Sequence, residues 1–561
     1  MPSLSRRSSS STSHPHQGHS LSNSPSSNSL SLDAATSSTH ADAADPQDET
    51  KFKQLLTVLK KAIGVKDMGA MRLSLPAHLI TPVGNLEYWC YLDRPDLFAA
   101  INDSDNDFER MLAVLRWTLT KDCKFVHGPI CKPYNSVLGE QFRCLYDVIP
   151  SKVDGESGDL LLFDTPSRAT SPTPPVSKRA MSSQTTSSST ALDPEDPPGA
   201  LWEANRSRSS LATSVNNNNN NNNKSTSPPT ARVVFLNEQV SHHPPISCFW
   251  YEARSTLDTP SSKPLVIAHG VDQISAKFTG TSVKVFPGPM NKGIFLKLPN
   301  RNEEYEITHP TATVTGLIRA SPYVVITDYA YITCRSAQKQ RFRAMINYVD
   351  ESWVGKAKFA LEGVIYELHD TEDGGEWTKI KQVPSERIWC KFSGSWRGSV
   401  TYTMTEQSRN KWCGLSDSNK TLELINLERL PPLPKTVKPE ERQTEMESRK
   451  FWSSLTRLIQ AKNFAEATKV KQAIEQHQRD LAQKRKTDNN PFVPLIFRID
   501  DDDHQQDDDD NTNHNLQPAA PGLPAPDGYA KFSKPTLTPA GAKILEAEFS
   551  GYGYDLPPLD A

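Results

Sequence analysis

Residues 238–245 read Glu-Gln-Val-Ser-His-His-Pro-Pro, directly after an apolar run that predicts a β-strand at 232–236. Adjacent histidines before two prolines are unusual, because Pro244 favours an extended backbone at His243. In an extended segment, neighbouring side chains point to opposite faces unless a turn gathers them. Three interpretations remain: a rigid strand end, a metal site and a phosphate site. A metal site needs a third ligand at suitable spacing, and none lies nearby. A phosphate site fits better, since imidazole donors suit an anionic group.

Two further motifs place cations beside an amide or a carboxylate. Residues 132–140 read Lys-Pro-Tyr-Asn-Ser-Val-Leu-Gly-Glu, a turn that leads into a strand predicted at 141–148. Taken alone, this motif is typical of a surface turn. On a predicted helix, Lys471, Glu475 and Arg479 are spaced four apart and therefore share one stripe. Taken alone, the stripe is typical of an exposed face with i,i+4 ion pairs.

Polar sequence divides the chain into folded and unfolded parts. Residues 1–48 have too few large apolar side chains to offset the entropy of ordering, so we expect a disordered tail. The segment at about 152–230, with its Ser/Thr tract and Asn run, is expected to be a disordered loop insert, since closing a longer loop costs little extra. Two four-aspartate blocks begin near Asp500, and we expect 489–561 to be a mostly disordered acidic tail. Residues 49–488 then form one domain.

The folded part shows two kinds of periodicity. Between about 232 and 405, short β-runs separated by turns predict a central antiparallel sheet. Helical periodicity flanks it at 111–119 and from 449 to about 486, so the fold class is α+β. A further amphipathic helix, which either packs in the core or covers a cavity as a flap, is predicted from Phe52, Leu55, Leu56, Leu59 and Ile63.

Composition excludes several classes of protein. A formal net charge of −3 supplies no whole-chain field for nucleic acid, so we expect no nucleic-acid partner. Eight scattered cysteines without a CxxC pair argue against a disulfide scaffold or zinc ribbon and favour reduced thiols in the cytosol. No apolar run reaches the ~18 residues of a membrane-spanning helix. No GxSxG motif accompanies the histidines, which argues against an esterase. We expect no enzyme activity, no metal and no cofactor.

Together, the three motifs resemble the oxysterol-binding protein family of lipid transfer proteins. Residues 238–245 match the family fingerprint EQVSHHPP, and 132–140 is similar to its KP(L/F/Y)NPxLGE motif, with Ser136 where proline is usual. The resemblance spans about 50–488 and extends to short, single-domain yeast members. It implies a large incomplete antiparallel β-barrel that encloses a lipid tunnel, with an N-terminal helical lid and C-terminal helices.

The resemblance also implies non-enzymatic transfer of phosphatidylinositol 4-phosphate in exchange for a sterol. The histidines would clasp the 4-phosphate, the other polar groups would contact the inositol phosphates, and the glutamate would orient the helix cations. By position, these contacts fall on Lys132, Asn135, His242, His243, Lys471, Glu475 and Arg479. The helix at 52–63 would be the lid. A monomer that acts peripherally on the cytosolic surface of membranes such as the endoplasmic reticulum and Golgi is expected.

Departures from the family pattern leave the second lipid open. A Gln-Tyr pair that holds sterol in relatives aligns with Phe125 and Val126, and an accompanying Asn aligns with Asp272. A lysine that touches phosphate in a relative aligns with Ser275, while Lys277 lies two positions on. Two alternatives to the sterol exchanger are a phosphatidylserine exchanger and a lipid sensor that transports nothing.

Overall fold

Thirteen stretches of the chain are described by this computed structural model: 80–121, 123–127, 132–154, 159–163, 230–257, 263–317, 322–336, 340–351, 357–369, 377–406, 408, 421–499 and 534–552. The expected lid helix at 52–63, the tail at 1–48 and most of the expected insert lie outside these residues. Within the described stretches, no helix is both long and apolar enough to cross a membrane.

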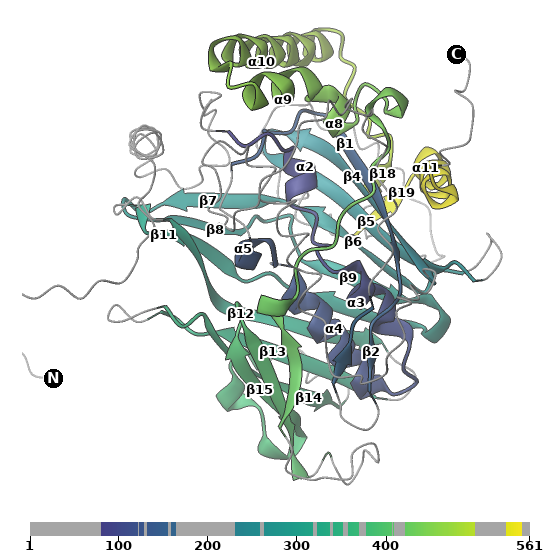
Figure 1. The fold of residues 1–561 in the computed structure, drawn as a ribbon, viewed down its shortest axis with the longest axis vertical. Coiled ribbons are helices and arrows are strands. Elements are labelled where there is room, and N and C mark those ends of the chain that lie inside the picture. The colour runs from purple at the N-terminus through teal and green to yellow at the C-terminus, as the bar shows by residue number, and fades with distance from the viewer. Residues whose placement is uncertain are drawn as a thin grey trace, which may run out of the picture. The chain divides into compact units, whose positions relative to one another are not determined.

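One large, curved antiparallel sheet of 15 strands dominates the described structure (Figure 1). Its main path runs β1-β4-β5-β6-β9-β10-β12-β13-β14-β15-β16-β17, and β7, β8 and β11 extend it beside β12. The strands are β1 (Gln141–Val148), β4 (Ala231–His242), β5 (Pro245–Ser255), β6 (Val266–Asp272), β7 (Ile274–Phe278), β8 (Val283–Pro287), β9 (Ile294–Leu298), β10 (Glu303–Ile307), β11 (Thr311–Thr315), β12 (Tyr323–Ser336), β13 (Arg341–Tyr348), β14 (Ala360–Leu368), β15 (Ile388–Ser395), β16 (Ser399–Met404) and β17 (Leu422–Asn426). The end strands β1 and β17 do not pair, which confirms the incomplete barrel.

The chain after β17 crosses to the opposite edge of the sheet. Leu145 in β1 exchanges two backbone hydrogen bonds with Thr436, at N···O distances of 2.9 and 3.0 Å. The amide of Gln141 donates to the carbonyl of Met446 at 2.8 Å. This segment therefore supplies backbone partners to β1, which would otherwise be an open edge.

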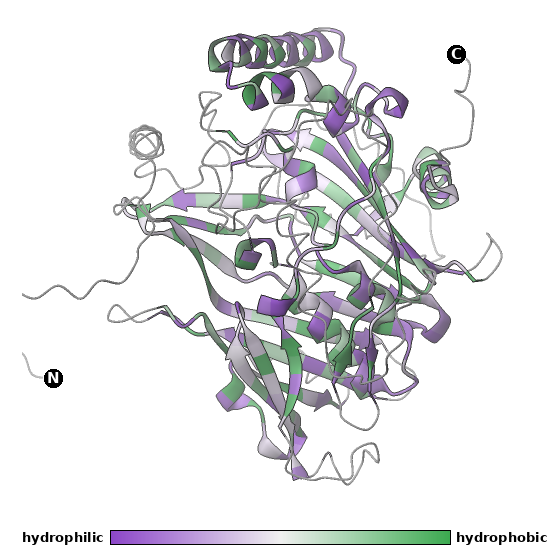
Figure 2. Ribbon diagram, viewed as in Figure 1, coloured by the Kyte–Doolittle hydropathy of each residue, from purple (hydrophilic) through white to green (hydrophobic). Residues whose placement is uncertain are grey.

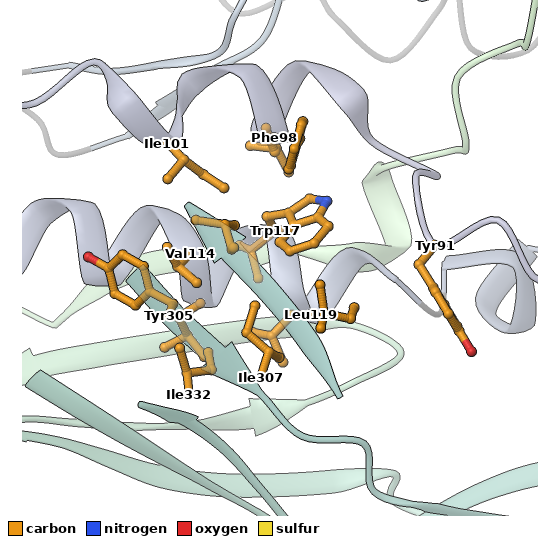
Figure 3. Close-up of a cluster of buried hydrophobic side chains, with 14 of the residues drawn as sticks. Tyr91, Phe98, Ile101, Val114, Trp117, Leu119, Tyr305, Ile307 and Ile332 are labelled. Carbon is orange, nitrogen blue, oxygen red and sulfur yellow. The ribbon is translucent and has the colours of Figure 1, made fainter. Parts of the chain in front are cut away.

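Helices α3 (Pro95–Ala99) and α4 (Asp107–Thr120) pack against the strands and fill much of the interior (Figure 3). Asn106 caps α4, since its side-chain oxygen accepts from the amide of Phe108 at 2.9 Å. Arg110 of α4 donates to both carboxylate oxygens of Glu303 in β10, at 3.1 and 3.0 Å, and both side chains are buried. A paired charge of this kind fixes one orientation of the helix on the sheet.

Smaller helices surround this core. Two short ones, α2 (Asn85–Tyr88) and α5 (Cys123–His127), flank α3 and α4 in sequence. After the sheet come α8 (Ser448–Phe451), α9 (Ser453–Gln460) and α10 (Phe464–Thr487), in the region where the sequence predicts helical periodicity from 449 to about 486. Figure 2 shows that the exposed ribbon of α10 is largely hydrophilic.

Parts of the region at 489–561, which we expected to be a mostly disordered tail, form secondary structure. Strands β18 (Phe497–Ile499) and β19 (Pro535–Leu537) pair, and α11 (Pro539–Ser550) follows them. These elements cover apolar side chains of β1, β4, β5 and β6 with Ile496, Phe497 and Leu545. In the sequence, a long polar tract separates these short apolar groups. No local pattern therefore predicts that they share one contact surface.

The beginning of the expected insert at about 152–230 is also ordered. Strands β2 (Lys152–Val153) and β3 (Leu160–Leu161) form a two-stranded sheet of their own. The apolar side chains of Val153 and Leu161 are exposed. The two strands therefore lack the alternation of buried and exposed residues from which a strand is predicted.

Candidate functional site

The histidine pair lies at the tip of the β4–β5 hairpin. His242 ends β4, and Pro245 begins β5 directly opposite it in the strand register. The turn gathers the two imidazole rings, whose centroids are 4.5 Å apart. His242 is half-buried and His243 is exposed. Two imidazoles therefore share one side of a rigid strand end, which is a suitable arrangement for an anion.

The 132–140 loop is joined to this hairpin through its backbone. The amide of Gly139 donates to the carbonyl of Gln239 at 2.9 Å, and the amide of Gln239 donates to the carbonyl of Glu140 at 2.8 Å. Gly139 has a φ of +82°, a conformation that side-chain-bearing residues seldom adopt. The left-handed glycine thus allows the loop to turn directly onto β4, three residues before His242.

Aromatic packing joins the same loop to the C-terminal helices. The Tyr134 ring stacks on Trp452 with centroids 4.7 Å apart, and its hydroxyl bonds the Thr456 hydroxyl at 2.9 Å. Tyr134 and Val137 share a hydrophobic cluster with residues of α9 and α10, including Ala467. Burial raises the pKa of Tyr134 to about 12, so the phenol stays neutral at physiological pH.

The α10 stripe is partly as expected. Lys471 and Glu475 form an i,i+4 ion pair. Arg479 is exposed and donates from Nε to the Gln476 side chain at 3.1 Å, and it forms no ion pair with any residue the structure describes. Its guanidinium therefore retains donors for an external anion.

The hairpin, the 132–140 loop and helices α8–α10 thus lie together at one end of the sheet (Figure 1). Lys132 and Asn135 are exposed on that loop. The predicted head-group positions therefore lie on three elements, and the 132–140 loop contacts both the hairpin and the C-terminal helices. The lid positions Phe52, Leu55, Leu56, Leu59 and Ile63 lie outside the described residues. No cluster of three metal-ligating side chains occurs in the described parts of the chain.

A separate apolar cavity lies between the α2–α5 region and the β7–β8–β11 side of the sheet. Its volume is about 70 Å³. This is roughly half of the ~150 Å³ cavity that holds one benzene in other proteins. Its lining residues are Trp89, Tyr91, Lys121, Phe125, Ile274, Val285, Phe286, Pro287, Asn291, His309, Pro310, Ala312 and Ile326.

One wall of this cavity carries a buried polar cluster. The Tyr91 hydroxyl donates to the Asp272 carboxylate at 3.1 Å, and the Asn291 amide donates to the same group at 3.1 Å. Burial raises the pKa of Asp272 to about 6, although the Tyr91 hydrogen bond and the Lys124 charge oppose the shift. The His309 ring lies against Tyr91, with centroids 5.3 Å apart.

Aromatic rings also surround the cation of Lys124. Its Nζ lies 5.9, 5.6 and 5.4 Å from the ring centroids of Trp89, Tyr91 and Phe125, within the range of a cation–π interaction. Phe125 lines the cavity, and Asp272 lies behind its Tyr91 wall.

Sequence reasoning did not identify the other polar groups of the cavity wall. Tyr91, Asn291 and His309 come from three segments without a motif. No spacing in the sequence indicates that they meet. Among the neighbouring positions, the sequence indicates Phe125 and Asp272, and it does so through the resemblance.

An open antiparallel barrel that carries an apolar pocket is the fold of a class of lipid-binding proteins. The family model described as oxysterol-binding protein matches residues 54–196 and 217–517. A relative in Schizosaccharomyces pombe, oxysterol-binding protein-like protein 1, is 38% identical over 528 residues, covering 90% of this chain and 92% of its own length. The chain therefore belongs to the oxysterol-binding protein family.

More distant relatives agree with this assignment. Human oxysterol-binding protein-related protein 10 is 25% identical over 432 residues, which is 77% of this chain but 44% of that protein. The crystal structure of the Osh1 ORD domain in complex with cholesterol shares the fold, with a TM-score of 0.50 and 16% identity over 90% of this chain and 98% of that one.

Proposed function

We propose that this protein carries phosphatidylinositol 4-phosphate and exchanges it for a sterol between membranes, without catalysing a reaction. The observation that carries the proposal is the grouping of the histidine hairpin, the 132–140 loop and α10 at one end of the sheet. Each element presents at least one group able to donate to phosphate: the imidazoles, Lys132 and Asn135, and Lys471 and Arg479.

The physical roles of rim and interior are complementary. A phosphorylated inositol cannot enter an apolar interior without a large desolvation cost, so the head group stays at the rim. Acyl chains leave water favourably, at ~0.8 kcal/mol per CH₂. Glu475, paired with Lys471, holds that cation in place beside Arg479. The related Osh1 domain was crystallised with cholesterol, which supports a sterol as the second ligand.

The cavity size implies that the interior opens as a lipid enters. A volume of about 70 Å³ is too small for a sterol. A sterol bound there requires lining side chains, such as those of Trp89 and Phe125, to move aside. One hydroxyl could then reach the buried Tyr91–Asp272–Asn291 cluster, which suits a ligand with a single polar group better than phosphatidylserine.

Liposome extraction tests the head-group assignment. His242→Ala combined with His243→Ala should abolish extraction of phosphatidylinositol 4-phosphate, because both imidazole donors are lost. His369→Ala is a matched control, since His369 is exposed at the end of β14. Undiminished extraction by the double variant, with normal unfolding, would overturn the assignment.

Native mass spectrometry of the purified protein tests the second cargo. A co-purified sterol mass supports sterol exchange, whereas a phosphatidylserine mass replaces sterol with that lipid. A protein that binds both ligands but moves neither between liposomes would be a sensor.

A further inference from the structure

An exposed apolar segment follows α10 directly. Val493 has an exposed fraction of 77% and Leu495 of 48%, so both side chains face solvent. Pro494 lies between Val493 and Leu495, and its fixed φ angle limits how far the segment can fold back on itself. Neighbouring exposed aliphatic groups lower the solubility of a protein unless a partner or a membrane covers them.

The last turn of α10 supplies a cluster of cations shortly before this segment in the sequence. Lys484, Arg485 and Lys486 lie in that turn, and none of the three forms an ion pair with a residue the structure describes. Cations at a helix C-terminus interact favourably with its dipole, which accounts for their position but not for the adjacent aliphatic groups. Asp488 is the single acidic residue between 481 and 499.

This segment is fixed to the candidate head-group site. The Phe492 ring lies 3.1 Å from the point that a Cβ atom on Gly139 would occupy. The amide of Leu495 donates to the Glu238 carboxylate at 2.8 Å, and Glu238 precedes His242 on β4. The exposed aliphatic groups are thus held beside the 132–140 loop and the hairpin strand.

The β2–β3 hairpin also exposes apolar side chains, but its neighbouring charges differ from those after α10. Val153 and Leu161 on the β2–β3 hairpin have exposed fractions of 45% and 42%. Their charged neighbours are Lys152, Asp154 and Asp159, so acidic groups outnumber basic ones there. Unlike the β2–β3 hairpin, the surface after α10 combines exposed aliphatic groups with a surplus of cations, and this combination favours binding to anionic membrane surfaces.

We propose that Lys484, Arg485, Lys486, Val493 and Leu495 form a membrane-docking surface, here named the 484–495 surface. Its cations attract an anionic leaflet, and its aliphatic side chains enter the interfacial region. This proposal rests on the proposed function. It adds which surface brings the lipid-binding end of the sheet to a bilayer.

Sedimentation with vesicles of phosphatidylcholine and phosphatidylserine, free of phosphoinositide, tests the surface. Val493→Asp should reduce the bound fraction of the full-length protein about tenfold, since a charge replaces an inserted aliphatic group. Lys484→Glu with Lys486→Glu should reduce it similarly, and the residual binding should respond less to added salt. Val153→Asp, an equivalent change at the control hairpin, should leave binding unchanged.

A separate measurement distinguishes failure of this surface from failure of the proposed function. Binding of a water-soluble, short-chain phosphatidylinositol 4-phosphate needs no bilayer, so Val493→Asp should bind it like the unaltered protein. Equal vesicle binding by Val493→Asp and the unaltered protein overturns the docking surface, as does an equal loss in Val153→Asp. Failure of the unaltered protein to bind the soluble lipid overturns the head-group assignment instead.

Discussion

The indole Nε1 of Trp452 donates a hydrogen bond of 3.0 Å to the carboxylate of Glu140, a residue 312 positions earlier in the chain. The same carboxylate accepts from the Ser448 hydroxyl at 2.6 Å and from the Val137 amide at 3.0 Å. Glu140 is fully buried, and burial raises its pKa. One carboxylate thus attaches the loop that carries Lys132 and Asn135 to the helices that precede α10.

Removing this carboxylate should destabilise the fold. Glu140→Ala removes the acceptor of three buried donors, on Val137, Ser448 and Trp452, and we expect the free energy of unfolding to fall by about 2–4 kcal/mol. Glu140→Gln keeps one acceptor oxygen and should lose less. Urea unfolding followed by tryptophan fluorescence measures both, with the exposed Glu441→Ala as control. Equal stability of Glu140→Ala and Glu441→Ala would contradict the role of Glu140.

The two faces of α10 should respond differently to charge reversal. Arg479→Glu places a negative charge where we propose that phosphate binds, so affinity for phosphatidylinositol 4-phosphate should fall at least about tenfold. Lys469 lies on the same helix and is occupied by an ion pair with Glu466 at 3.0 Å. Lys469→Glu should therefore change affinity less than about twofold. Titration with short-chain lipid checks the pair, and equal losses would show a nonspecific charge effect.

The ion pair between α11 and the sheet should contribute a small coupling energy to stability. Arg254 of β5 donates two hydrogen bonds to Glu546 of α11, at 2.8 and 2.7 Å. Its guanidinium also lies 4.0 Å from the Phe549 ring centroid. Because Glu546 is largely exposed, we expect a coupling energy of only about 0.5–1 kcal/mol. Thermal unfolding of Arg254→Glu, Glu546→Arg and the combined variant measures it, and strict additivity of the two single changes would exclude coupling.

Asp272 should make stability depend on pH. Burial raises its pKa from 3.8 to about 6, so the folded protein binds this proton more tightly than the unfolded chain. The favourable contribution is complete below pH 3.8 and disappears as the pH rises to about 6. The asparagine of Asp272→Asn cannot ionise. As the pH rises across that window, the free energy of unfolding of this variant should therefore increase relative to that of the unaltered protein, by an amount on the order of 2–3 kcal/mol. Chemical unfolding at several pH values tests this, and a constant difference would contradict it.

How far the sequence predicts the structure depends on the range of the interactions. Alternating apolar residues predict a strand such as β16 because this strand buries one face along its own length. Helix α11 was missed because its stabilising partners, such as Arg254, lie in strands far away in the sequence. The head-group residues are found through local motifs. The cavity wall is not, since Tyr91 and Asn291 meet only after the sheet has formed.

The position of α11 also affects how the chain emerges from the ribosome. Strands β4 and β5 are complete by residue 255, yet the helix that covers their outer face begins at 539. At ~5–20 residues per second, translation of the intervening segment takes roughly 15–60 s. During that time Val234, Leu236 and Cys248 remain uncovered on that face. A nascent-chain chaperone therefore has a defined apolar target, which α11 covers only after residues 539–550 have been translated.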